Sequence, residues 1–218
     1  MDIRRFFTYL IPYIIKGIPV TISVSALALM MGAVIGIFLS MLRVYGRKSI
    51  QIILTVYGTV FRSIPQTVLL LLLFFSIAGS INIEPYWAAV FSLTIISSSY
   101  QTEIFRGAFL SIDSGQMMAA RAIGMSRGKA IQVIMLPQVF RRALPAWTNE
   151  VAVTIKASAL VYILGIPEML RLAQYDISRT KQPFPAYLAV GLLYFLLIYT
   201  TNRILRMVEQ KLRIEGMQ

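Results

Sequence analysis

The segment MMAARAIGMSRGKAIQVIMLP, residues 117–137, lies between two strongly apolar regions and differs from both. It carries three cations, Arg121, Arg127 and Lys129, and a pair of adjacent alanines. Gly124 interrupts it, and glycine permits a turn that a β-carbon would obstruct. Small residues let a helix approach another surface closely. The pattern alone fits two interpretations: a helix that docks into a groove of a partner, or a solvated basic loop near anionic lipid.

The composition around this segment indicates a membrane protein. Hydrophobic residues make up 57% of the 218 and charged residues only 14%, and the mean hydropathy is +0.72. Soluble domains are far less apolar. The net charge of +12 is also typical of nucleic-acid binding, but no basic face with interleaved aromatics is present. We therefore expect a lipid bilayer around the chain and no nucleic acid partner.

Two residue types are missing from the sequence. There is no cysteine and no histidine, which removes thiolate chemistry, the commonest metal ligand and the commonest general base. We expect no metal site and no catalytic residue in this chain. A small intramembrane enzyme remains the competing class, but it would have to be built from carboxylates, lysines or hydroxyls.

Long apolar segments predict an all-α, polytopic membrane protein. A spanning helix needs about 20 apolar residues. The sequence offers about five such segments, at residues 18–42, 50–79, 86–110, 145–165 and 184–202. The second contains Arg62 and Pro65, and a proline there predicts a kink. A secondary transporter is disfavoured, because these spans contain no paired inverted repeats.

Charge asymmetry orients the chain, because cationic loops stay in the cytoplasm. The loops on the side of segment 117–137 hold about twice as many Lys and Arg residues as the loops on the other side. We expect a multi-pass protein of a prokaryotic cell membrane, with its N-terminus outside and its C-terminus in the cytoplasm. Residues 1–16 are expected to lie along the interface as an amphipathic helix.

The opening segment resembles the EAA loop of binding-protein-dependent ABC importers. In that pattern two alanines, a glycine and a Leu-Pro pair stand at fixed spacing, and the spacing here is complete. One position departs: Met118 replaces the family's glutamate, which helps to hold the coupling helix in the ATPase cleft. The resemblance implies that the residues of ATPase coupling are Met118, Ala119, Ala120, Arg121, Gly124, Leu136 and Pro137.

The resemblance covers nearly the whole chain and is strongest to the polar amino acid branch of these permeases. FRSIPQTVLLLLLFF looks like that branch's Arg-Gly-Thr-Pro segment, and EIFRGAFLSIDSGQ and LPQVFRRALPAWTNE match closely. IKASAL, residues 155–160, departs from the commoner Leu-Lys-Asp-Thr-Ser-Leu, because Ala157 takes the acidic position. An importer of opines or of another small polar solute is the alternative within this architecture.

The resemblance also implies a fold and partners. Residues 1–218 would form a single transmembrane permease domain with the type I ABC importer (MetI-like) fold, in which residues 112–137 are the cytoplasmic coupling loop. A second permease subunit, an ABC ATPase dimer and an extracytoplasmic solute-binding protein would complete the system, with an amino acid as substrate. ATP and Mg²⁺ would bind to the ATPase and no cofactor to this chain. Its nearest match to a phosphate loop, residues 124–130, has the wrong spacing and ends in alanine.

Two ionisable residues, Glu150 and Lys156, fall inside the fourth predicted span. Six helical residues rotate by about 600°, so these side chains point about 120° apart and cannot pair on a regular helix. Asn149 shares a face with Lys156, and Glu150, Thr154 and Ser158 form a second polar stripe. We expect one stripe to line the translocation path and to meet the amino or carboxylate group of the solute. The alternative is that both charges are structural, buried between helices or against a sister subunit.

Two further patterns have structural interpretations. Glu103 and Arg106, three residues apart, are expected to form an intrahelical ion pair. Gly32 and Gly36 form a GxxxG pattern, which typically lets two membrane helices pack closely.

Overall fold

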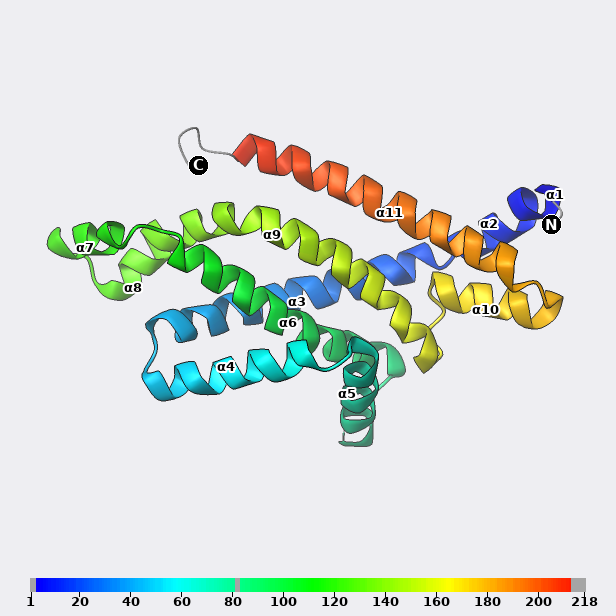
Figure 1. Cartoon of the computed structure of the whole chain (residues 1–218), viewed down its shortest axis with the longest axis horizontal. Coiled ribbons are helices and arrows are strands. Elements are labelled where there is room, and N and C mark those ends of the chain that lie inside the picture. Colours follow the sequence, from blue (N-terminus) through cyan, green and yellow to red (C-terminus); the bar gives the residue numbers. More distant parts are fainter. Residues whose placement is uncertain (1–2, 81–82, 213–218) are drawn as a thin grey trace.

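Four long helices lie alongside one another in the computed structural model, which describes residues 3–80 and 83–212 (Figure 1). They are α3 (Ile18–Tyr45), α6 (Pro85–Leu110), α9 (Leu136–Ala157) and α11 (Pro183–Leu212). α6 contacts both α3 and α9, and α11 contacts α9. The described part of the chain contains no strand. The prediction of an all-α fold is confirmed.

Glycine allows the close approach of α3 and α6. A β-carbon built on Gly36 would lie 2.9 Å from Gln101 Cβ and 3.1 Å from the Thr102 backbone nitrogen in α6. A β-carbon on Gly32 would lie 2.8 Å from Gln101 Nε2. These distances are shorter than the 3.5–4.0 Å of ordinary carbon contacts. The packing role expected of this GxxxG pattern is confirmed.

The second predicted span is two helices, not one. α4 (Lys48–Ser63) and α5 (Gln66–Ser80) meet at Pro65 and are bent by 113°. Ile64, the residue before the proline, has an extended backbone because the proline ring disfavours helical geometry there. The predicted break at Pro65 is confirmed, and the bend there is much sharper than a kink within a straight helix (Figure 1).

The N-terminal residues form a helical lead into α3. They comprise α1 (Ile3–Arg5), a π-helical turn (Phe6–Leu10) and α2 (Ile11–Ile15). Phe6, Leu10 and Ile14 are buried against residues of α10 (Met169–Thr180) and α11. Arg5 donates to the buried Asp176 carboxylate at 2.7 Å. Whether this lead lies at the membrane interface stays a prediction.

At the other end of the bundle the chain forms a small helical turn structure. α7 (Ser114–Ala122) and α8 (Arg127–Ala130) project beyond the long helices, and a π-helical turn (Ile131–Met135) leads from α8 into α9. At its far end, away from this turn, α9 continues as a 3₁₀ segment (Ser158–Leu164) before α10. The α7–α8 turn and the C-terminal end of α11 lie toward the same side of the molecule, opposite the N-terminus (Figure 1).

Several helices have the length and composition of membrane spans. Among the described residues, Ile3–Tyr45 and Pro183–Lys211 are each apolar enough to cross a bilayer, and the count rises to 4 if each bent helix pair is one span. α6 has 26 residues, or about 39 Å at 1.5 Å per residue, and so is also long enough. Its Ser and Thr side chains turn back to bond the helix's own carbonyls, as Ser92 and Thr94 do.

Candidate functional site

The α7–α8 turn is built around Gly124. The Met125 N–H donates to Ala120 O at 3.1 Å and the Gly124 N–H donates to Arg121 O at 3.1 Å. These two bonds form a Schellman motif, which needs a left-handed residue after the helix end, and Gly124 has φ of +86°. The Arg121 guanidinium donates to Met125 O at 2.9 Å and closes the same turn. The spacing from the alanines to Gly124 therefore encodes a helix stop.

The turn presents an apolar tip. Met118 is 66% exposed and Ile123 is 78% exposed, although both are large and apolar. Ala120 is buried against the rest of the turn, whereas Ala119 is exposed. After the turn, Leu136 packs on the neighbouring core, and the exposed Pro137 lies in the first turn of α9, directly after the π-helical turn. The coupling role of these residues stays a prediction.

A polar cavity of about 380 Å³ lies between α4, α6 and α9. Small-ligand sites have volumes of about 300–1,000 Å³, so the cavity is large enough for a small solute. It contains a guanidinium from α4, a carboxyl group from each of the other two helices, a phenol and an amide. Its lining residues are Arg62, Tyr100, Glu103, Ile104, Ala146, Asn149 and Glu150.

Glu150 is held in this wall by hydroxyl groups. Ser97 Oγ donates to Glu150 Oε1 at 2.9 Å, and Thr154 Oγ1 donates to the same oxygen at 3.2 Å. Oε2 has no partner among the residues that the structure describes. Ser97 is positioned in turn by Gln101, whose Nε2 donates to Ser97 Oγ at 3.0 Å and to Leu29 O at 3.0 Å. A buried relay thus fixes one oxygen of Glu150 and leaves the other available.

The two predicted stripes of α9 have different environments. Asn149 and Lys156 are exposed, whereas Glu150, Thr154 and Ser158 are buried. Of the five, Asn149 and Glu150 line the cavity. Ser158 lies away from it and donates to Ile155 O at 2.8 Å. One residue of each stripe therefore lines the cavity, a combination that was not expected from the helical periodicity.

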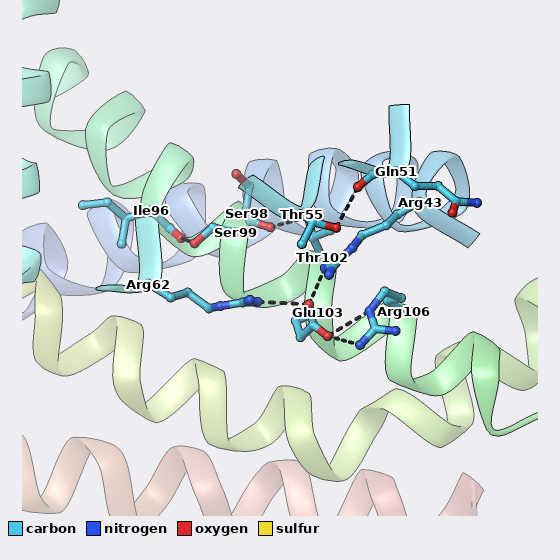
Figure 2. Close-up of polar contacts among 10 residues, drawn as sticks. All are labelled: Arg43, Gln51, Thr55, Arg62, Ile96, Ser98, Ser99, Thr102, Glu103 and Arg106. Carbon is cyan, nitrogen blue, oxygen red and sulfur yellow. Dashed lines mark hydrogen bonds and ion pairs between the residues drawn. The ribbon is translucent and has the colours of Figure 1, made fainter. Parts of the chain in front are cut away.

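A cluster of three arginines converges on Glu103 (Figure 2). Arg106 donates to Oε1 from one helical turn away, as expected from the sequence. Arg62 from α4 donates to Oε2 at 3.1 Å, and Arg43 from α3 reaches the same oxygen. Glu103 therefore ties α3, α4 and α6 together through one carboxylate, which the intrahelical pairing alone did not predict.

Comparison with known proteins identifies the family to which this fold belongs. The family described as "Binding-protein-dependent transport system inner membrane component" matches residues 32–214. The chain belongs to this family. It is a membrane permease component of a transport system and not an enzyme, which removes the intramembrane enzyme left open by the composition.

Relatives of this permease are similar over nearly their whole length. The arginine transport system permease protein ArtQ of Bacillus subtilis is 31% identical, with 93% of this chain and 94% of the relative covered. The glutamine transport system permease protein GlnP of Escherichia coli is 32% identical, with 94% of both chains covered. A solved amino acid ABC transporter with histidines matches with a TM-score of 0.81 at 32% identity, covering 92% of this chain and 94% of that one. The inward-facing MetNI methionine transporter has a similar fold, with a TM-score of 0.75, 18% identity and coverage of 92% and 96%.

The permease contains site residues that the sequence did not reveal. Gln101 is fully buried, and its side-chain oxygen accepts from Trp147 Nε1 at 2.8 Å. Ser97 links this pair to Glu150. A signal was present in the segment SSSYQT, residues 97–102, because so many hydroxyl and amide groups in a membrane helix need partners. Ser97 and Gln101 find partners in other helices, at Glu150, Leu29 and Trp147. Ser98, Ser99 and Thr102 donate to carbonyls of their own helix.

Proposed function

We propose that this permease forms the membrane path of an ATP-driven amino acid uptake system. The observation that carries the proposal is the cavity, where the Arg62 guanidinium and the Glu150 carboxyl group line one space large enough for a small solute. The names of the relatives support it, since they refer to transport of arginine, of glutamine, and of histidine, lysine, arginine and ornithine. An opine or another small polar solute carries similar charged groups and is the second candidate.

The α7–α8 turn is the proposed docking site for an ABC ATPase dimer, which binds ATP and Mg²⁺. Its exposed Met118, at the position of the family's glutamate, and its exposed Ile123 offer an apolar contact. Gly124 ends α7 sharply, so the short helix can enter a cleft without a longer helix following it. Closure of the ATPase dimer would push on α7, and the continuous path through α8 into α9 would carry the displacement to the cavity wall.

The exposed face of α9 is the proposed boundary with a second permease subunit. Ala146, Asn149 and Lys156 lie on this face. An uncovered lysine within a membrane helix is costly, so a partner subunit or a water-filled path must meet it. The solute path would run along this boundary, with an extracytoplasmic binding protein delivering the solute. The excess of cations on the α7–α8 side supports an orientation with that side and the C-terminus in the cytoplasm and the N-terminus outside.

The test is reconstitution with the genomically adjacent ATPase and solute-binding protein in lipid vesicles. Amino acids are added one at a time, and both ATP hydrolysis and solute uptake are measured. Stimulation by one class of amino acid is expected. Stimulation by no amino acid, with the complex intact, would reject the proposal.

The role of Glu150 is tested in the same vesicles. Glu150→Gln removes the charge but keeps the size, and we expect uptake to be lost while the ATPase still binds. Glu84→Gln is the matched control, because Glu84 is exposed at the start of α6 and does not line the cavity. Unchanged uptake by the Glu150 variant would show that this carboxyl group is structural.

A further inference from the structure

Arg62 differs from the other two arginines of the Glu103 cluster. It lines the cavity, whereas Arg43 and Arg106 are not among the lining residues. Its guanidinium lies over Gly58, where an added β-carbon would be 3.5 Å from Nη2. Its single hydrogen bond to Glu103 uses Nη1, so most of its five N–H donors remain for another acceptor.

The cluster also carries excess positive charge. All three guanidiniums form their ion pairs with one carboxylate, and no other acidic partner pairs with them within the described ranges 3–80 and 83–212. Arg106 contacts Glu103 through two of its nitrogens, and Arg43 is the least exposed of the three, at 12%. Glu103 is thus satisfied by Arg43 and Arg106 alone. The third cation, Arg62, is 27% exposed and lines the cavity.

We propose that Arg62 recognises the carboxylate of the transported solute, while Glu150 meets its amino or other cationic group. This inference rests on the proposed uptake function and specifies the solute as a zwitterion with a free α-carboxylate. The planar fork of arginine matches a carboxylate in two parallel hydrogen bonds, a geometry that lysine cannot supply. Arg62 and Glu150 come from different helices, α4 and α9, and are not paired with each other in the structure.

The competing interpretation is that Arg62 only neutralises Glu103 and ties α4 to α6. Arg43 provides the matched control, because it bonds the same carboxylate oxygen, Glu103 Oε2, but does not line the cavity. A purely structural role predicts similar effects of Arg62→Gln and Arg43→Gln. A recognition role predicts that only Arg62→Gln changes the preference for a carboxylate.

The experiment measures binding to the purified permease–ATPase complex without the solute-binding protein, so that the permease alone selects. The probe is the tritiated form of whichever of L-arginine, L-histidine or L-glutamine stimulates ATP hydrolysis in the vesicles. It is competed with the unlabelled amino acid and with its α-amide, which lacks the carboxylate. The unaltered complex is expected to prefer the acid by about tenfold or more, the range for hydrogen bonds to charged groups.

Arg62→Gln is expected to bind acid and amide within about twofold of each other, whereas Arg43→Gln keeps the preference. Arg62→Lys, which keeps the charge and the contact with Glu103, is expected to give an intermediate preference and serves if Arg62→Gln does not assemble. An undiminished preference in the Arg62 variants, or an equal loss in Arg43→Gln, would overturn the inference alone. Absence of any amino acid binding to the unaltered complex would overturn the proposed function and the inference together.

Discussion

The contact between α3 and α6 gives a prediction whose size follows from the structure. A β-carbon on Gly36 would lie 2.9 Å from Gln101 Cβ, 3.1 Å from the Gln101 carbonyl carbon and 3.1 Å from Thr102 N. Two of these atoms are backbone and cannot rotate away. Restoring ordinary contacts of about 3.5–4.0 Å therefore requires the helices to separate locally by about 0.5–1 Å.

Gly36→Ala should consequently destabilise the permease. Overpacking of this kind costs about 1–3 kcal/mol, and the better helix propensity of alanine returns up to about 1 kcal/mol. With the full return from helix propensity the net loss is about 0–2 kcal/mol, or a fall of up to about 8 °C in melting temperature at 2–4 °C per kcal/mol for a chain of this size. The control is Gly191→Ala in α11, where an added β-carbon meets nothing within 4 Å, so no fall is expected.

Thermal unfolding of the detergent-purified variants, followed by tryptophan fluorescence, measures this difference. Gly32→Ala is an informative third variant, because the atom nearest its β-carbon would be the side-chain Gln101 Nε2 at 2.8 Å, and the nearest backbone atom, Ser98 N, would be 3.3 Å away. We expect it to melt above Gly36→Ala but to disturb the Gln101–Ser97 bond that positions Glu150. The reasoning would be refuted if Gly36→Ala melted as high as Gly191→Ala.

Three further predictions concern the turn and the relay. Gly124→Ala adds a β-carbon that meets no neighbouring atom, but the residue has φ of +86°, so we expect backbone strain of about 1–2 kcal/mol. Amide hydrogen exchange of residues 114–126 should accelerate, and unchanged protection would contradict the Schellman motif at Gly124. Ile123→Asp should change the melting temperature by no more than about 2 °C, because surface substitutions cost little stability. It should reduce the amount of ATPase that co-purifies with the permease. Full recovery of the ATPase would argue against the apolar tip as a contact. Ser97→Ala removes a hydrogen bond to Glu150 and should weaken solute binding about threefold to tenfold without preventing assembly; equal binding would show that Thr154 alone suffices.

The sequence predicted local features well because their causes are local. The stop at Gly124, the break at Pro65 and the Glu103–Arg106 pair all arise within a few residues along one helix. The joining of Arg43 to Glu103 was not predictable in this way, since the two residues are 60 positions apart and meet only when α3 packs on α6. Helical periodicity separated Asn149 from Glu150, yet a cavity formed by three helices accepts side chains from more than one stripe. The 113° bend after α4 was underestimated because the proline rule sets where a helix ends and not where the chain goes next.

Because three arginines pair with the single carboxylate of Glu103, the arginines and the glutamate should differ in how well they tolerate mutation. Replacing Arg106 leaves Arg43 and Arg62 on the carboxylate, so α3, α4 and α6 stay connected, whereas replacing Arg43 removes the link to α3. Replacing Glu103 leaves three cations that repel one another in a medium that screens poorly. Natural and laboratory variants of this permease should therefore accumulate changes at Arg106 far sooner than at Glu103, the one acid that joins the three helices.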